Sequence, residues 1–159
     1  MSLVTEFNDY RQRMNEQILA ADNKVIKRFF NLDTNTYQAG ALDVKTKEML
    51  GLACSMVLRC DDCIKYHLGK CQEEGLTDEE IYEVFAIANL IGGSIVIPHF
   101  RRAVEYWEAL KQEPGYAAPT PAAPGVPTPR QAADRAQQRH EQAAHGIVSS
   151  ATSTETAGA

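Results

Sequence analysis

The chain has 159 residues, of which 44% are hydrophobic, and its formal net charge is -5. This length predicts one domain with additional chain beyond it, and the acidic balance argues against electrostatic binding to nucleic acid or to an anionic membrane surface. No apolar run approaches the roughly 18 residues that indicate a membrane span, so we expect no membrane association.

The first residues, 1–6, do not contain a basic segment followed by an apolar core. We therefore expect no secretory signal and a cytoplasmic protein. In that compartment the four cysteines are expected to be reduced, catalytic or metal-binding rather than joined in structural disulfides.

The first predicted element is an amphipathic helix over residues 5–30. Its apolar side chains recur mostly every three or four positions, and Arg, Gln, Glu and Lys fill the positions between them. Residues 31–35 are predicted to form a turn. A short helical piece over residues 36–39 is expected to end at Gly40.

The next predicted helix begins after Asp43, a favourable N-cap residue, and extends to residue 58. This segment is apolar nearly all round, which predicts a buried central helix. Cys54 is therefore expected to be an ordinary core residue.

The chain is predicted to break around Cys60 and then to restart as a helix. Asp61 and Asp62 suit the first turn of that helix, because the helix macrodipole favours negative charge there. This helix is expected to stop near Gly75.

Residues 77–80, Thr-Asp-Glu-Glu, form the pattern of a capping box. The helix that it opens is predicted to end at Gly92 and Gly93. A last helix is predicted over residues 94–112, with Pro98 in or just after its first turn and Trp107 facing the core.

No segment shows the sustained alternation of a strand, so residues 1–112 are predicted to form an all-α helical bundle. Residues 113–159 change to a Pro/Ala-rich linker followed by a low-complexity tail. This tail cannot bury enough apolar surface to order itself, so we expect it to be disordered unless bound. Its apolar pair, Ile147 and Val148, makes it a candidate peptide for docking to a larger assembly.

Cys60, Cys63 and His67 form the most informative motif of the chain. Residues three or four apart share a helix face, so two thiols and an imidazole converge locally. A helix N-terminus and a neighbouring histidine both favour the thiolate, which is the reactive form. Once Cys63 is oxidised to a sulfenic acid, Cys60 is close enough to condense with it as a disulfide.

Glu48 is a carboxylate in an otherwise apolar helical run. A buried carboxylate usually has a partner or a raised pKa. Glu48 can therefore accept, directly or through a water, the proton that His67 takes from the thiol.

These residues, Glu48, then Cys60-x-x-Cys63, then His67, resemble the alkylhydroperoxidase D branch of the carboxymuconolactone decarboxylase family. The resemblance covers roughly residues 7–111 and leaves out the tail. It implies an all-helical fold that assembles as trimers or hexamers.

The resemblance also implies a function. Cys63 is expected to attack a hydroperoxide, Cys60 to resolve the sulfenate as a disulfide, and Glu48 and His67 to relay the proton. The reductant would be a dihydrolipoyl protein or another dithiol donor, and no cofactor or metal is implied.

One position departs from the peroxidase members, because Asp62 stands where they carry a histidine. The alternative function is a disulfide reductase, or a redox-sensing helical oligomer without peroxidase turnover. The decarboxylase branch generally lacks the Cys pair, which argues against lactone decarboxylation.

Plainer interpretations remain open for the same residues. Cys60 and Cys63 can be small buried residues at a helix junction, and His67 can be a core or interface histidine. A zinc site would add Cys71 to these three, but one straight helix cannot surround a tetrahedral ion. Cys71 is otherwise expected to be a small core residue.

Glu48 has a competing interpretation too. By helical spacing it shares a face with Lys45, Ser55 and Arg59, which would form an exposed stripe. His99, after Pro98, either reaches the site from the last helix or is a structural histidine.

Overall fold

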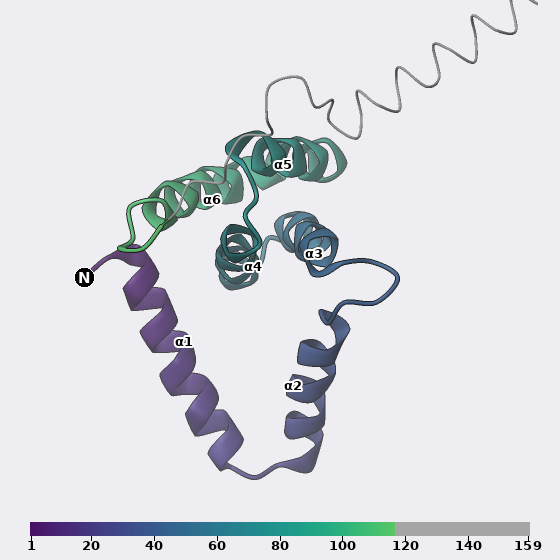
Figure 1. The fold of residues 1–159 in the computed structure, drawn as a ribbon, viewed down its shortest axis with the longest axis vertical. Helices are drawn as coiled ribbons and strands as arrows, with labels where there is room; N and C mark the ends of the chain where they lie inside the picture. Colours follow the sequence, from purple (N-terminus) through teal and green to yellow (C-terminus); the bar gives the residue numbers. More distant parts are fainter. Residues whose placement is uncertain (117–159) are drawn as a thin grey trace, which may run out of the picture. The chain divides into compact units, whose positions relative to one another are not determined.

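The computed structural model describes residues 1–116, and within them all the regular secondary structure is helical, with no strand (Figure 1). The all-α prediction is confirmed. The elements in order are α1 (Leu3–Ala20), α2 (Lys24–Thr36), α3 (Val44–Leu58), α4 (Asp61–Glu73), α5 (Asp78–Gly92), the 3-10 helix η1 (Gly93–Val96) and α6 (Ile97–Leu110). The predicted linker and tail lie almost wholly outside the described residues.

The core lies among α3, α4, α5 and α6, which pack on one another, while α1 packs against α6. Leu52, Leu68, Phe85 and Trp107 are fully buried at its centre. Burying each such side chain contributes about 1.5–3 kcal/mol before the entropy of ordering is subtracted. The Trp107 indole Nε1–H donates to Asp78 Oδ1 at 2.8 Å, so this buried ring keeps a polar partner.

The predicted single helix over residues 5–30 is wrong, because the chain turns between α1 and α2. Asp22 adopts a left-handed conformation with φ 54°. The side chain of Asn23 then accepts hydrogen bonds from the backbone N–H groups of Val25 and Ile26, which caps a new helix.

The predicted turn at 31–35 and the short helix at 36–39 are also wrong, since α2 continues to Thr36. Its polar side chains bond within the helix: the Thr34 and Thr36 hydroxyls donate to the carbonyls of Phe30 and Leu32. These residues are turn formers by propensity, but a local hydrogen bond to the preceding turn lets them stay helical.

The helix α3 is only partly the buried central helix that its composition predicted. Leu52 and Met56 are fully buried, but Leu58 is 75% exposed and Leu50 is 52% exposed. Cys54 is exposed as well, so its assignment to the core is wrong. Within residues 1–116, an apolar face of α3 is left without a partner.

The predicted starts of α3 and α5 are confirmed, but the last helix begins later than the predicted residue 94, because Gly93–Val96 forms η1 and α6 begins at Ile97. Asp43 accepts a hydrogen bond from Thr46 N–H at the start of α3. Thr77 and Glu80 form the complete capping box of α5. The helix α5 ends at Gly92, and Gly93 follows with φ 71°, a backbone conformation that suits glycine.

By length and composition alone, the helical stretch Asp78–Leu110 passes as a candidate membrane span, with a mean hydropathy of 1.6 over 18 residues. It comprises α5, η1 and α6 and changes conformation at Gly93. Only 28% of that window is buried. The absence of membrane association therefore stays a prediction, and the apolar surface of this stretch needs another explanation.

Candidate functional site

The junction between α3 and α4 places the two cysteines of the motif. Arg59 ends α3 in a left-handed conformation with φ 59°, and the Cys60 N–H reaches back to the Ser55 carbonyl at 3.0 Å. This is the hydrogen bonding of a helix end closed by a left-handed residue. Cys60 is then the N-cap residue of α4, and Cys63 lies in its first turn.

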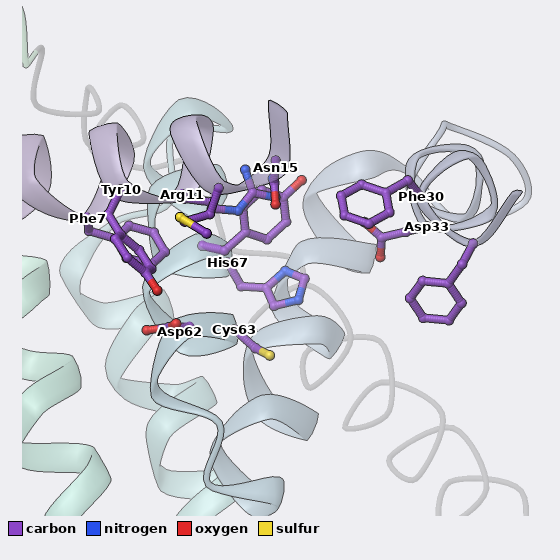
Figure 2. Close-up of a pocket in the computed structure, with 12 residues that line it drawn as sticks. Phe7, Tyr10, Arg11, Asn15, Phe30, Asp33, Asp62, Cys63 and His67 are labelled. Atoms are coloured by element: carbon purple, nitrogen blue, oxygen red, sulfur yellow. The ribbon is translucent and has the colours of Figure 1, made fainter. Parts of the chain in front are cut away.

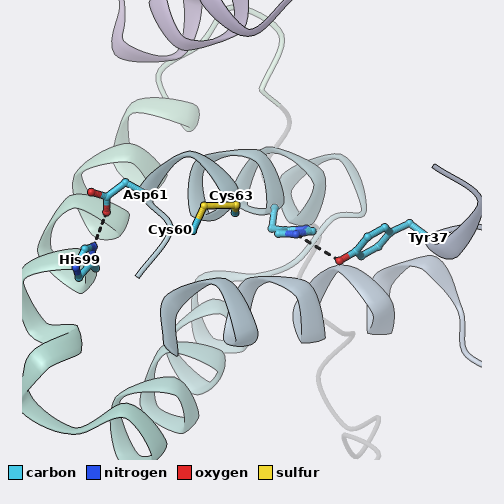
Figure 3. The surroundings of a disulfide bond; sticks show 6 residues. Tyr37, Cys60, Asp61, Cys63 and His99 are labelled. Carbon is cyan, nitrogen blue, oxygen red and sulfur yellow. Dashed lines mark hydrogen bonds and ion pairs between the residues drawn. A yellow bond between two sulfur atoms is a disulfide. The ribbon is translucent and has the colours of Figure 1, made fainter. Parts of the chain in front are cut away.

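Cys60 and Cys63 are joined as a disulfide, with a Cα–Cα distance of 5.3 Å (Figure 3). The predicted pairing of these two thiols is therefore present in the structure. Because the free N–H groups of a helix N-terminus favour negative charge, the thiolate released on reduction would be stabilised at this position.

His67 lies one turn after Cys63, and its imidazole contacts Glu48 of α3. His67 Nδ1 is 2.7 Å from Glu48 Oε2, and both side chains are buried. With Glu48 ionised, Nδ1–H donates to the carboxylate and fixes the ring, as carboxylates commonly orient histidines. The exposed-stripe interpretation of Glu48 is thus wrong, since Glu48 is only 2% exposed.

Tyr37 is a site residue that the sequence analysis missed. Its hydroxyl lies 3.4 Å from His67 Nε2, the ring nitrogen opposite Glu48 (Figure 3). Burial first, and then the nearby Glu48 carboxylate, raise the pKa of Tyr37 above its ordinary value. A neutral Tyr37 can therefore donate to Nε2 whenever His67 is neutral. Tyr37 follows α2 and is distant in sequence, so no local spacing pointed to it.

Gly51 is a second residue that the sequence analysis missed. A Cβ atom added at Gly51 would lie 2.5 Å from His67 Cε1. Gly51 is three residues after Glu48 on α3, so it leaves the space that the imidazole occupies beside the carboxylate.

A cavity of about 360 Å³ opens onto Cys63 and His67 (Figure 2). This volume is within the ordinary range for small-molecule sites. Its walls come from α1, α2 and α4 and are rich in aromatic rings. The lining residues are Phe7, Tyr10, Arg11, Met14, Asn15, Phe29, Phe30, Asp33, Asp62, Cys63, Tyr66 and His67. The guanidinium of Arg11 lies 4.2 Å from the centroid of the Tyr66 ring.

The remaining candidates fall into two groups. Cys71 is fully buried, and burial raises the pKa of its thiol to about 12, which makes it an inert core residue as expected. His99 does reach the start of α4, where its Nδ1 lies 2.7 Å from Asp61 Oδ1. Within residues 1–116, no group of three or more His, Cys, Asp or Glu side chains is arranged to hold a metal ion.

Among known proteins, solved structures from two bacteria resemble this chain. A carboxymuconolactone decarboxylase family protein of Thermotoga maritima, described as a candidate for a role in the antioxidative response, is 55% identical. The match covers 67% of this chain and 90% of that one, with a TM-score of 0.64. A family protein of Legionella pneumophila, 23% identical, shares the fold with a TM-score of 0.64 over 69% of this chain and 97% of its own.

Two curated sequences are also related. An uncharacterized protein of Cupriavidus necator is 32% identical over 73 residues, which span 46% of this chain and 65% of that protein. Uncharacterized protein 4 in the cox locus of Paracoccus denitrificans is 30% identical over 76 residues, or 48% of this chain and 68% of its own. The sequence profile of the carboxymuconolactone decarboxylase family matches residues 23–106, more than half of the chain. The chain therefore belongs to the carboxymuconolactone decarboxylase family.

Proposed function

We propose that this protein is a thiol-dependent oxidoreductase of the alkylhydroperoxidase D type that reduces hydroperoxides. The observation that carries the proposal is the Cys60–Cys63 disulfide at the start of α4, beside a cavity that His67 shares with Cys63. Family membership and the candidate antioxidative role of the Thermotoga maritima protein support it. The fold alone would not support the proposal, because one fold hosts many activities.

In the proposed cycle, the Cys63 thiolate attacks the terminal oxygen of a hydroperoxide, ROOH. The O–O bond breaks, Cys63 becomes a sulfenic acid, and the alcohol ROH leaves with a proton from His67. The Cys60 thiol then attacks the Cys63 sulfur, which forms the disulfide and releases water. Glu48 stabilises the imidazolium form of His67 between these steps, because the two side chains are 2.7 Å apart.

A dithiol donor, such as a dihydrolipoyl protein, would return the disulfide to two thiols and become a cyclic disulfide itself. The sum of the cycle is ROOH plus dithiol giving ROH, water and disulfide. We propose cytoplasmic action with this donor and a homo-oligomer, a trimer or hexamer, as the working form.

The test is steady-state reduction of an organic hydroperoxide with dihydrolipoamide as donor. The Cys63→Ser variant should lose turnover, and the Cys60→Ser variant should consume about one equivalent of hydroperoxide and then stop. Equal residual turnover in the two variants would contradict the assigned roles.

A second candidate function is a disulfide reductase or redox sensor without peroxidase turnover. The observation that favours it is Asp62, a carboxylate in the cavity wall where the peroxidase members that the sequence resembles have a histidine. In that case the parent would show no hydroperoxide turnover, while the Cys60–Cys63 disulfide would still form with oxidant and be reduced by a dithiol.

A further inference from the structure

A cluster of three charged or titratable side chains holds the start of α4 against α6. Asp61, the first residue of α4, accepts from His99 at 2.7 Å and from Arg102 Nε at 3.1 Å. His99 and Arg102 are three residues apart on α6, so they share a helix face. Figure 3 shows the Asp61 carboxylate directed toward His99, beside the disulfide.

The distances in this cluster show that the Asp61 carboxylate is paired. His99 Nδ1 lies 2.7 Å from Asp61 Oδ1 and 2.9 Å from Arg102 Nη2, so it donates to the carboxylate as Nδ1–H or accepts from the guanidinium in the other tautomer. Arg102 can only donate, and its Nη2 is 3.0 Å from Asp61 Oδ2. Burial alone would raise the pKa of Asp61, but the hydrogen bonds from His99 and Arg102 hold it below its ordinary value. Asp61 is therefore a paired carboxylate at neutral pH.

This pairing matters because Asp61 directly follows Cys60 and is two residues before Cys63. An unpaired carboxylate there would oppose the helix N-terminus, which favours a thiolate. The charged or titratable side chains around the dithiol include Glu48 and Arg59 on or next to α3, Asp61, Asp62 and His67 on α4, His99 and Arg102 on α6, and Tyr37 after α2. The cavity onto which Cys63 opens adds Tyr10 and Arg11 of α1, Asp33 of α2 and Tyr66 of α4.

We propose that Arg102, with His99, is a positioning residue for the dithiol: it neutralises and turns aside the Asp61 carboxylate, which preserves the stabilisation of a thiolate at the start of α4. The inference rests on the proposed redox role of Cys60 and Cys63. It adds α6 to the elements that set the reactivity of the thiols.

The test measures the pH dependence of alkylation of the reduced full-length protein by iodoacetamide. All variants carry Cys54→Ala, because Cys54 is an exposed free cysteine and would react as well. Arg102→Gln should raise the pKa of the reactive thiol by about 0.5, or roughly threefold in thiolate fraction, since pairs this exposed contribute modestly. Arg101→Gln is the matched control, because Arg101 is the exposed neighbour on the same helix and has no ion pair in the described chain.

Asp61→Asn should shift the same pKa in the opposite direction, because it leaves the Arg102 cation near the thiols. The double variant Asp61→Asn/Arg102→Gln should return close to the parent value. If the cluster were purely structural, both single variants would shift the pKa of the reactive thiol in the same direction, and that result would overturn the proposal. A thiol pKa in Arg102→Gln equal to that in Arg101→Gln would overturn it as well.

A second readout separates this proposal from the proposed function. In the equilibrium with glutathione, Arg102→Gln should favour the disulfide more than the parent does, because its thiolate is less stable. If the parent shows no hydroperoxide turnover but these shifts appear, the function fails and the positioning role stands. If turnover is present and both shifts are absent, the positioning role fails alone.

Discussion

At the scale of single residues, the proposed chemistry depends on the contact between His67 and Glu48. The buried carboxylate lies 2.7 Å from Nδ1 and stabilises the imidazolium that forms when His67 takes a proton from the thiol. The Tyr37 hydroxyl lies at the other ring nitrogen and completes a chain of three groups. Each of the three comes from a different part of the sequence, and α4 holds only one of them.

Replacing Glu48 by Gln keeps the shape of the side chain and removes its charge. We expect Glu48→Gln to lower turnover at neutral pH by roughly tenfold or more and to shift the pH profile upward, because the Cys63 thiolate loses the imidazolium that Glu48 stabilises and forms only at higher pH. The measurement is the hydroperoxide reduction rate across pH. Glu74→Gln, an exposed carboxylate at the end of α4, is the control. An unchanged profile for Glu48→Gln would remove the relay.

Gly51 gives a steric test of the same contact. A methyl group at Gly51 would collide with the His67 ring at 2.5 Å, so Gly51→Ala should displace the imidazole and reduce turnover strongly. Gly69→Ala on α4 is the matched control, because an added Cβ there meets nothing within 4 Å. That variant should keep full turnover and gain up to about 1 kcal/mol of stability from better helix propensity. Equal turnover in the two variants would show that the position of His67 is unimportant.

The local residues of the site were predictable from the sequence, and the distant ones were not. Cys60, Cys63 and His67 follow helical spacing, so a repeat of three or four residues is enough to bring them together. Tyr37 and Gly51 act through contacts between elements, for which helical spacing carries no signal. The isolated acidic residue in an apolar run, Glu48, was the one tertiary partner with a visible sequence signal.

At the scale of elements, an ion pair between Lys45 and Glu80 links α3 to α5. The Lys45 ammonium donates to both carboxylate oxygens of Glu80, at 2.8 and 2.9 Å. Burial alone would raise the pKa of Glu80, but hydrogen bonds from Lys45 and from the Thr77 N–H lower it. A lowered pKa contributes stability that is present above the ordinary pKa of glutamate and is lost as the pH falls through the folded value.

Glu80→Gln should therefore cost about 0.5 kcal/mol of unfolding free energy at pH 7, a small amount because the pair is partly exposed. The cost should disappear in acid, where Glu80 of the parent is protonated too. Gln can still accept from Thr77, so the capping box is kept. Denaturant unfolding of the parent and of Glu80→Gln at pH 7 and at pH 3 measures this difference in unfolding free energy. Glu79→Gln, which removes an exposed charge from the same turn, should cost less at pH 7; an equal cost would mean that Lys45 contributes nothing.

Helix ends were predictable where one residue caps them, and they were missed where the break has no such signal. Asp43, Thr77 and Gly93 act through their own side chain or backbone, and each boundary was found. The break between α1 and α2 depends on the left-handed conformation of Asp22, which interrupts an apolar pattern that reads as continuous. The extension of α2 through residues 31–36 depends on side-chain bonds inside the helix.

At the scale of the whole molecule, apolar faces on α2, α3 and α5 lack a cover within the described chain. The helix α2 buries none of its residues, and Val25, Phe29 and Leu32 are 63–74% exposed. On α5, Leu90 and Ile91 are 84% and 68% exposed. Apolar patches of this kind commonly mark association surfaces. A second copy of the chain would cover them. Because Phe29 also lines the cavity, its burial in such an interface would fix the position of one cavity wall.

We therefore expect an oligomer by light scattering. The variant Leu90→Glu/Ile91→Lys should shift it toward smaller species, because charges would have to be buried in the interface. Glu105→Lys, a charge change at an exposed position on α6, should leave the size unchanged. A parent that scatters as a monomer would contradict the assembly.

The most direct test of the central claim is to locate the sulfenic acid. Reduced Cys60→Ser protein is treated with one equivalent of an organic hydroperoxide in the presence of dimedone, and the adduct is mapped by mass spectrometry, with Cys63→Ser treated in parallel. The account predicts an adduct on Cys63 in the first variant that forms much faster than any adduct on Cys60 in the second. Adducts that form on both cysteines at equal rates, or on neither, would contradict a peroxidase with Cys63 as its nucleophile.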